Sequence, residues 1–151
     1  NFQFVMIKHK PLSLTVSLLP SEIQPELRPI IKSKIIGHTN KYSKQHKIFI
    51  TKITDITIPK YGTTSRTNFV VSFSISCNVE YIKPEKDEII DAVLQNKNQY
   101  GIFLKNEYSK IIVPKSYYND DAFFELNKKY SVKIIETRYT NEGISCICTF
   151  N

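Results

Sequence analysis

Residues 84–116 read PEKDEIIDAVLQNKNQYGIFLKNEYSKIIVPKS, and this stretch decides the expected fold of the C-terminal half of the chain. Short aliphatic and β-branched runs alternate in it with polar turns. This pattern indicates an antiparallel meander with strands over 88–94, after Gly101 and over 110–113. Gly101 follows Tyr100 where a strand must bend sharply or admit a second backbone closely. We therefore expect the stretch to begin a small closed barrel.

The residues after 116 are expected to complete that barrel. Residues 117–129 are polar and aromatic, and they suit a loop or a short helix. Alternating side chains then predict strands over 130–139 and 144–150, joined by a turn at 141–143. Five strands with an excursion between the third and the fourth predict an all-β OB-fold barrel.

The N-terminal half predicts a different architecture. Alternation indicates a strand over 7–19, and apolar residues at helical spacing indicate a helix over 25–36. Pro29 is tolerated in this helix if it lies in the first turn. Two longer strands are expected over 48–58 and 69–82.

This arrangement predicts two domains. Residues 1–82 form an α+β domain with a basic polar turn at 38–47 and a tip loop at 59–67, and residues 83–151 form the barrel. One helix with three strands makes a module too small to be secure alone, so we expect the two domains to pack together.

Charge is distributed unevenly between these domains. Residues 1–82 carry eleven Lys or Arg and four Asp or Glu, a difference of +7, whereas residues 83–151 carry ten of each kind. A basic surface attracts nucleic acid or an acidic protein face over a long range. The alternative is that the excess serves only solubility.

The chain offers little for metal, cofactor or catalytic chemistry. Cys146 and Cys148 point to one face of a strand, where a disulfide would be strained, so we expect buried free thiols. The three histidines have no zinc-ligand spacing to the cysteines. Asp120 and Asp121 are adjacent without a Ser or His partner motif, and no glycine-rich phosphate loop occurs. We expect no metal, no cofactor and no enzyme activity.

Several short motifs carry a resemblance to known families. KDEIIDAV at 86–93, YGIF at 100–103 and VPKS at 113–116 resemble the S1 domain, the RNA-binding domain repeated in the largest protein of the small ribosomal subunit. IIKSKI at 30–35 and VEYIKP at 79–84 precede them. With these, the layout resembles the seventh-subunit (stalk) family of eukaryotic and archaeal RNA polymerases, in which an N-terminal tip domain precedes a C-terminal OB-fold.

The resemblance runs from Leu12 to Phe150 and implies a non-catalytic polymerase subunit. It implies docking on RNA polymerase core subunits through the N-terminal domain, and weak contact of the OB-fold with nascent single-stranded RNA. A second stalk subunit is left open as a further partner. The alternatives are a free-standing single-stranded RNA-binding OB-fold protein and an accessory to a nuclease.

The chain departs from its cellular relatives in being shorter, with a tip loop reduced to YGTT at 61–64. A shortened version rich in Lys, Ile and Asn resembles those of large DNA viruses, with fungal or protist nuclear proteins as the alternative. No signal peptide and no run of about 18 apolar residues occurs, so no membrane partner is expected. The expected location is intracellular, in the host cytoplasm or virion for a viral protein and in the nucleus for a cellular one.

The resemblance implies that Tyr100 and Phe103 stack on RNA bases, with phosphate contacts from nearby lysines. These lysines are Lys97, Lys105, Lys110 and Lys115. The alternative is that Phe103 packs in the core, Tyr100 lies on the rim and the lysines are merely solvated. Pro114 replaces the histidine of the family and this half has no net charge, so weak RNA affinity is expected.

Docking on the polymerase is expected to use two loops of the N-terminal domain. The candidates are Pro59, Tyr61 and Gly62 in the tip loop and Lys41, Tyr42 and Lys44 in the basic turn. We expect both loops at one end of the same sheet, where basic charge would surround exposed apolar residues. The alternative for the basic turn is that it faces plain solvent.

Overall fold

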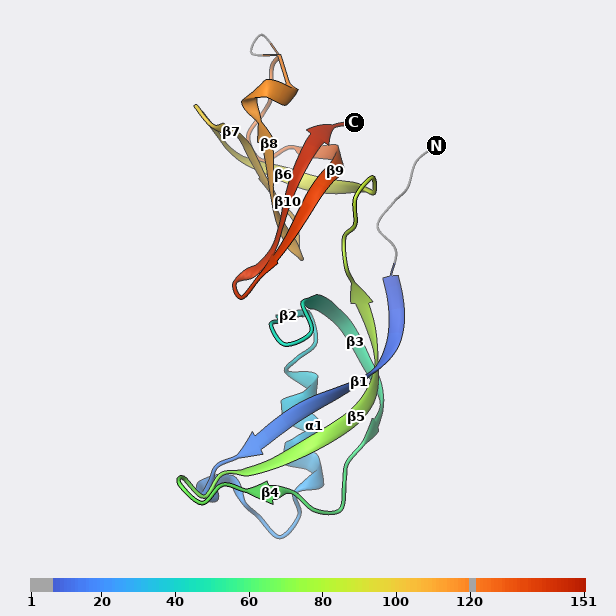
Figure 1. The fold of residues 1–151 in the computed structure, drawn as a ribbon, viewed down its shortest axis with the longest axis vertical. Coiled ribbons are helices and arrows are strands. Elements are labelled where there is room, and N and C mark those ends of the chain that lie inside the picture. The colour runs from blue at the N-terminus through green and yellow to red at the C-terminus, as the bar shows by residue number, and fades with distance from the viewer. Residues whose placement is uncertain (1–6, 120–121) are drawn as a thin grey trace. The chain divides into compact units, whose positions relative to one another are not determined.

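The computed structural model describes residues 7–119 and 122–151 of the chain. These residues are mostly β, with a single α-helix (Figure 1). No helix within them is long and apolar enough to cross a membrane. Contacts divide the chain into two compact units, which are residues 42–49 with 82–151, and residues 8–41 with 50–81.

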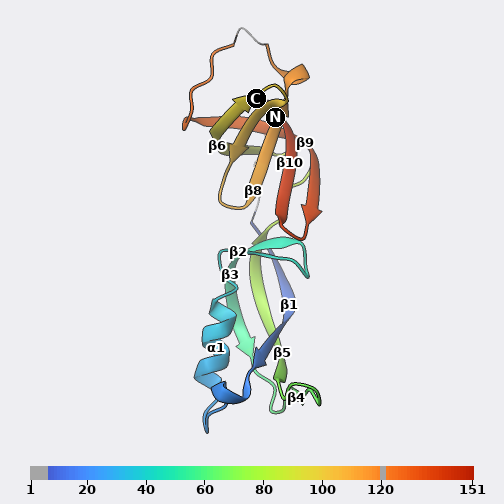
Figure 2. The ribbon, with the colours of Figure 1, turned by 90° about the vertical axis from the view of Figure 1, so that its left-hand side faces the viewer.

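The first unit contains a five-stranded barrel, closed in the order β10-β8-β7-β6-β9 (Figures 1 and 2). Its strands are β6 Ile89–Asn98, β7 Gly101–Lys105, β8 Ser109–Pro114, β9 Lys129–Thr140 and β10 Gly143–Phe150. Strand β10 pairs antiparallel with β9 and parallel with β8. The predicted closed five-stranded barrel is confirmed, and its closure removes the unpaired edges that an open sheet would present.

Apolar side chains alternate along these strands and fill the barrel. Ile102 and Leu104 are buried, whereas Phe103 between them is partly exposed. The other buried side chains include Ile90, Ala92, Leu94, Ile111, Val113, Val132, Ile134, Ile144, Cys146 and Cys148. Cys146 and Cys148 are buried free thiols, as predicted, and Cys77 is a buried free thiol as well. Burial of this apolar surface is the main stabilising contribution to the barrel.

Aromatic rings close both ends of the barrel. Where β9 begins and β10 ends, four rings contact one another, those of Tyr118, Phe124, Tyr130 and Phe150. The rings of Phe124 and Phe150 stack with centroids 4.5 Å apart. At the opposite end Phe49 joins the barrel core, and its ring centroid lies 6.2 Å from that of Tyr108. Residues 42–49 therefore complete the core of the barrel unit.

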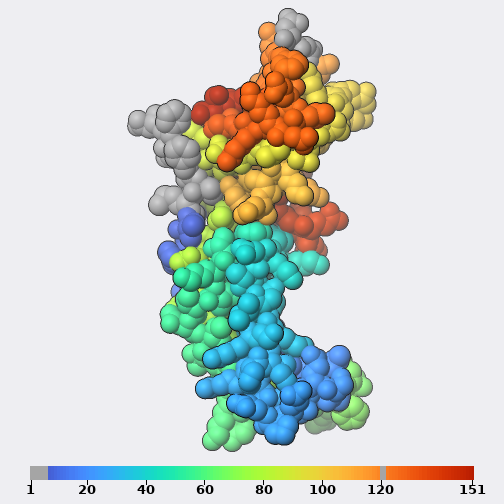
Figure 3. Space-filling view, turned by 180° about the vertical axis from the view of Figure 1, so that it is seen from behind, coloured from blue at the N-terminus to red at the C-terminus, as the bar shows by residue number. Residues whose placement is uncertain are grey.

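The second unit is an open sheet with one helix packed on one of its two faces. The sheet has the order β1-β5-β3-β2, and the short β4 pairs with β5. The helix and strands of this sheet are β1 Ile7–Leu18, α1 Arg28–Ile36, β2 Lys41–Ser43, β3 Ile48–Thr57, β4 Thr63–Thr64 and β5 Val71–Ile82. Some strand ends, among them residues 42–43 of β2 and 48–49 of β3, belong to the barrel unit. Helix α1 lies along one face of the sheet, where Ile31 and Ile35 are buried (Figure 2). In the space-filling view α1 and its flanking loops cover that face (Figure 3).

Several predicted boundaries in this unit need correction. Helix α1 begins at Arg28 instead of 25, and Pro29 lies in its first turn, where a missing N–H loses no helical hydrogen bond. Strand β5 begins at Val71, because Phe69 has a left-handed φ of 58°, outside the strand region. Strands β2 and β4 were not predicted, since each is too short to show a period. An α+β domain spanning residues 1–82 remains a prediction.

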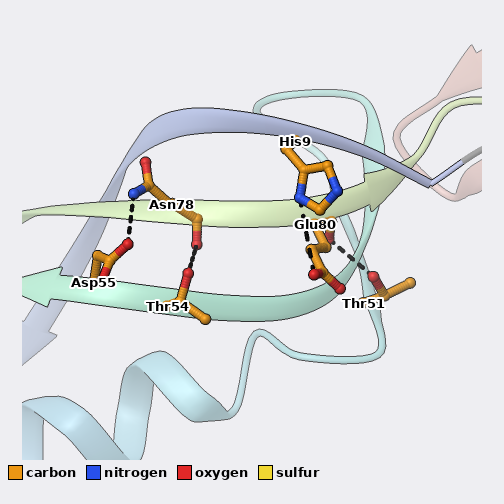
Figure 4. Close-up of polar contacts among 6 residues, drawn as sticks. All are labelled: His9, Thr51, Thr54, Asp55, Asn78 and Glu80. Carbon is orange, nitrogen blue, oxygen red and sulfur yellow. Dashed lines mark hydrogen bonds and ion pairs between the residues drawn. The ribbon is translucent and has the colours of Figure 1, made fainter.

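Polar side chains connect the long strands on the outer face of this sheet, opposite α1 (Figure 4). The Asn78 amide donates a hydrogen bond to the Asp55 carboxylate at 2.8 Å, and the Thr54 hydroxyl donates to the Asn78 carbonyl at 3.4 Å. His9 Nδ1 lies 3.8 Å from the Glu80 carboxylate. These contacts link β1 and β3 to β5, which lies between them.

Gly101 is a backbone requirement of the barrel. Its φ is 149°, and a Cβ there would lie 2.3 Å from the carbonyl oxygen of Val113. Gly101→Ala should lower the free energy of unfolding by about 2 to 4 kcal/mol, measured by urea denaturation. Gly143 is a matched control, because its φ is 147° but an added Cβ would meet nothing within 4 Å. Equal losses in the two variants would contradict a close approach of β7 and β8.

Alkaline pH should destabilise the barrel through Tyr139. Its hydroxyl donates to the carbonyl of Pro84, and burial raises the pKa of Tyr139 to about 12 from 10.0. The unfolded chain loses this proton near pH 10.0 while the folded barrel retains it, so the free energy of unfolding should fall between these two pH values.

Tyr139→Phe removes this titration and should make that fall shallower in urea unfolding measured across the same pH range. Burial also raises the pKa of Tyr108, so part of the fall should persist in the variant. A slope identical to that of the parent chain would assign the whole effect to other groups and contradict the prediction.

Candidate nucleic-acid interface

The residues predicted to meet RNA lie on three neighbouring strands and their connections. They are Lys97 in β6, Tyr100 in the β6–β7 turn, Phe103 and Lys105 in β7, Lys110 in β8, and Lys115 in the 3-10 turn Lys115–Tyr117. The structure brings Phe103, Lys105 and Lys110 together on the outside of the barrel, and it separates the other three from them.

Phe103 belongs to an apolar row that crosses the outer surface of the barrel. Because side chains alternate along a strand and its neighbours Ile102 and Leu104 point inward, Phe103 points outward. The register places Phe103 opposite Ile112 of β8, and Ile112 opposite Ile147 of β10. All three outward side chains are partly exposed. They form a continuous apolar row over β7, β8 and β10.

A cationic row runs beside the apolar row. Lys105 lies opposite Lys110, Lys110 opposite Ser145, and Ser145 opposite Arg138 of β9. The two lysines and Arg138 are exposed. The Arg138 guanidinium also lies 3.8 Å from the Glu136 carboxylate, which offsets part of its charge. An aromatic ring, Phe103, and positive charge thus lie side by side, and single-stranded nucleic acid is commonly bound by aromatic stacking beside a basic surface.

Three members of this surface, Ile112, Ile147 and Arg138, were not predicted from the sequence. Each occupies an outward position in the alternation of its own strand, so the sequence does indicate that its side chain faces outward. Which outward residues become neighbours depends on the register between β8, β9 and β10. That register is not readable from any one strand.

The remaining RNA candidates lie at the ends of strands. Lys97 follows a register shift between Leu94 and Asn96, and its Nζ lies 5.5 Å from the centroid of the Tyr118 ring. Lys97 therefore faces the aromatic cluster that closes one barrel end. Tyr100 is 68% exposed, and its carbonyl accepts a hydrogen bond from the Lys115 N–H at 3.3 Å. These two residues meet at the β6–β7 turn, outside both rows.

A pocket of about 200 Å³ lies beside the cationic row. The rings of Tyr42, Phe49 and Tyr108 line it together with Lys105 and Lys110, and two glutamates also contribute. Burial raises the pKa of Tyr108 above its ordinary value. The mixed charge of the lining does not by itself select a phosphate group.

The docking candidates are divided between the two units. Pro59, Tyr61, Gly62 and Lys41 belong to the open-sheet unit, whereas Tyr42 and Lys44 belong to the barrel unit. Tyr61 is 79% exposed, while Gly62 packs on β5, since an added Cβ would lie 2.8 Å from the Val71 side chain. Tyr42 is half-buried against the barrel core. The structure therefore does not gather these candidates within one unit.

Acidic, histidine and cysteine side chains form no metal cluster in the part of the chain that the structure describes. Within residues 7–119 and 122–151, no three of them come close enough together to hold a metal ion. Asp120 and Asp121, the acidic pair considered in the sequence analysis, lie outside the described residues.

Comparison with known proteins shows similarity over nearly the whole chain. The chain is 24% identical over 159 aligned residues to DNA-directed RNA polymerase II subunit rpb7 of Schizosaccharomyces pombe. The alignment covers 93% of this chain and 92% of that protein. No family model matches the chain. The similarity extends over both units and is not limited to the barrel.

Proposed function

We propose that this chain is a non-catalytic stalk subunit of a DNA-directed RNA polymerase. The observation that carries the proposal is the end-to-end similarity to an RNA polymerase II subunit, which covers 93% of this chain and 92% of the relative. The barrel fold alone would not indicate a polymerase subunit, because small β-barrels serve many unrelated functions. The relative is fungal, and a viral source for this chain remains a prediction.

We propose that the open-sheet unit docks on the polymerase core subunits through its loop end. The Ser17 and Ser72 hydroxyls lie 3.0 Å apart, and Thr63 pairs with Ser72, so the loops following β1 and flanking β4 lie at one end of the sheet. These loops carry four exposed apolar side chains, Leu19, Ile23, Tyr61 and Phe69. We call these four residues the tip surface. We propose that together they make a contiguous apolar patch, the kind of exposed surface that marks a protein contact.

The barrel contributes contact with nascent single-stranded RNA in this proposal. Bases would stack on Phe103 and pack along Ile112 and Ile147, while phosphates would meet the adjacent cationic row. Stacking tolerates any base, which suits a transcript of variable sequence. The barrel half has no net charge, so the affinity should be weak and sensitive to salt.

RNA binding should depend on the two rows. Lys105→Gln with Lys110→Gln should weaken binding to a labelled oligouridylate about tenfold, measured by fluorescence anisotropy. The same pair should also reduce the slope of log affinity against log salt by about 0.7 for each phosphate that the lysines no longer neutralise. The matched control is Lys86→Gln with Lys133→Gln, which removes the same charge from other exposed positions of the barrel unit.

Single aromatic variants test the path of the RNA across the barrel. Phe103→Ala should cost about 1 to 3 kcal/mol of binding free energy, whereas Tyr100→Ala should cost less because Tyr100 lies outside the rows. A larger effect at Tyr100 would move the path to the β6–β7 turn. Unchanged binding in both the Phe103 and the double lysine variants would contradict RNA contact at the rows.

Docking should fail when the tip surface becomes charged. Tyr61→Asp with Phe69→Asp should abolish co-purification of large polymerase subunits with the tagged full-length chain, because burying two carboxylates in an apolar contact is costly. Phe69 has a left-handed φ, which Asp tolerates well, so folding should be retained. Phe123→Asp is the control, since Phe123 is 81% exposed in the barrel unit.

The same experiment separates the proposal from a free-standing RNA-binding protein. A stalk subunit should recover polymerase subunits in the parent and the Phe123 variant and lose them in the tip-surface variant. Recovery of RNA without polymerase subunits in all three forms would reject the stalk assignment and favour the free-standing alternative.

A further inference from the structure

The pocket beside the cationic row lies between two hairpin turns of the barrel unit. Strand β7 turns into β8 through residues 106–108, and β9 turns into β10 through residues 141–142. The register pairs Ser109 with Ile144, so the two turns lie next to each other at one end of the barrel. Every residue that lines the pocket belongs to the barrel unit, and the pocket is therefore formed within one unit.

Three aromatic rings form the apolar part of the pocket. Phe49 is buried in the barrel core, and Tyr42 and Tyr108 are partly buried and pack against that core. The rings of Phe49 and Tyr108 are tilted by 54° and have centroids 6.2 Å apart, so they do not stack face to face on each other. The pocket volume of about 200 Å³ is below the roughly 300 to 1,000 Å³ of sites for drug-sized ligands. It therefore suits a single planar ring system and not a whole nucleotide.

Some polar groups of the two turns hold the turns in place. The Asn106 amide oxygen accepts hydrogen bonds from the Ser109 N–H at 2.8 Å and from the Ser109 hydroxyl at 2.9 Å. In the other turn the Thr140 hydroxyl donates to the Gly143 carbonyl at 3.1 Å and accepts from the Glu142 N–H at 3.2 Å. These local bonds fix the backbone on which the charged side chains of the pocket are carried.

Four charged side chains line the pocket without neutralising one another. Lys105, Glu107, Lys110 and Glu142 are all exposed, and none of them forms an ion pair or a side-chain hydrogen bond with any residue that the structure describes. A ligand that uses all the groups of this pocket combines a flat ring, hydrogen-bond donors for the carboxylates and negative charge for the ammonium groups. A nucleotide within RNA has all three properties.

We propose that the pocket holds a guanine base of the bound RNA, while the phosphates lie along the cationic row. This inference rests on the RNA contact proposed above and adds a base preference, which the two rows do not supply. Guanine differs from the other bases in presenting two adjacent donors, N1–H and the 2-amino group, on its Watson–Crick edge, and a carboxylate can accept from both. Unpaired bases of RNA are commonly read on this edge while their rings pack on aromatic side chains.

The position of the charged groups suits such a nucleotide. Glu107 and Glu142 supply the acceptors for the base, one from each turn. Lys105 and Lys110 line the same pocket and also belong to the cationic row, so a phosphate can meet them while its base enters the pocket. The two carboxylates repel phosphate, which favours entry of the base over entry of the backbone.

Fluorescence anisotropy with the full-length chain and labelled oligoribonucleotides tests this inference. Replacing the central uridine of an oligouridylate with guanosine should tighten binding about tenfold, whereas adenosine or cytidine at that place should not. Inosine, which lacks the 2-amino group, should lose most of this gain. Free guanosine monophosphate should compete at least about tenfold more weakly than the guanosine oligonucleotide, because it leaves most of the cationic row unfilled.

Glu107→Gln with Glu142→Gln should abolish the guanosine preference without reducing the affinity for oligouridylate. The amide keeps the size of the side chain but no longer accepts two hydrogen bonds side by side. Glu125→Gln with Glu136→Gln is the matched control, since it removes the same charge from exposed positions of the barrel unit outside the pocket. The control should retain the preference, and all four positions are exposed, so both variants should fold.

The possible failures of this inference and of the proposed function can be told apart. Equal affinity for all the substituted oligonucleotides, or a preference that survives in the Glu107 and Glu142 variant, would overturn the guanine pocket and leave the RNA contact standing. Binding of none of the oligonucleotides would overturn the RNA contact and the pocket together, whereas the stalk assignment is tested separately by recovery of polymerase subunits. Competition by guanosine monophosphate as strong as that by the oligonucleotide would assign the pocket to a free nucleotide and overturn the inference as well.

Discussion

The pairing of β10 with both β8 and β9 is the interaction on which the barrel depends. The contact with β9 is local, since a short turn joins the two strands, but the parallel contact with β8 joins segments separated by an excursion and a whole strand. That contact converts a meander into a closed ladder with no unpaired edge. Within the same barrel, β7 and β8 approach each other closely at Gly101, where an added Cβ would lie 2.3 Å from the Val113 carbonyl oxygen.

Closure of the barrel also determines its outer surface. The register that turns Ile102, Leu104 and Ile111 inward places Phe103 beside Ile112 and Lys105 beside Lys110. Apolar and cationic side chains from separate stretches of sequence therefore become two adjacent rows. In the proposed contact with RNA, this surface acts through stacking and charge and needs no base-specific groups.

The two units differ in whether their sheet has an edge strand, and this difference separates their possible roles. The barrel has no free strand edge, so its outer face and its pocket are what it can offer to a partner. The open sheet covers one face with α1 and leaves β1 at its margin. It can therefore offer both a strand edge and the exposed apolar loops around Tyr61 and Phe69.

The sequence by itself determined the elements whose signals are local. Alternation located the five barrel strands, the spacing of α1 identified the one helix, and Gly101 after Tyr100 marked the tight approach. The burial of Cys146 and Cys148 as free thiols also followed from their positions in an alternating strand. These properties depend on a residue and its near neighbours in the chain, so a single sequence contains them.

Only the tertiary structure decided which of these elements meet. It added Ile112, Ile147 and Arg138 to the RNA candidates. It placed Lys97 at the end of the barrel, beside the Tyr118 ring. It also grouped residues 42–49 with the barrel core instead of with the tip loop. Each outcome depends on the register between strands distant in sequence, or on the packing of a ring such as Phe49 into a core formed elsewhere. The energies of these contacts arise only in the folded barrel, so no local sequence pattern predicts them.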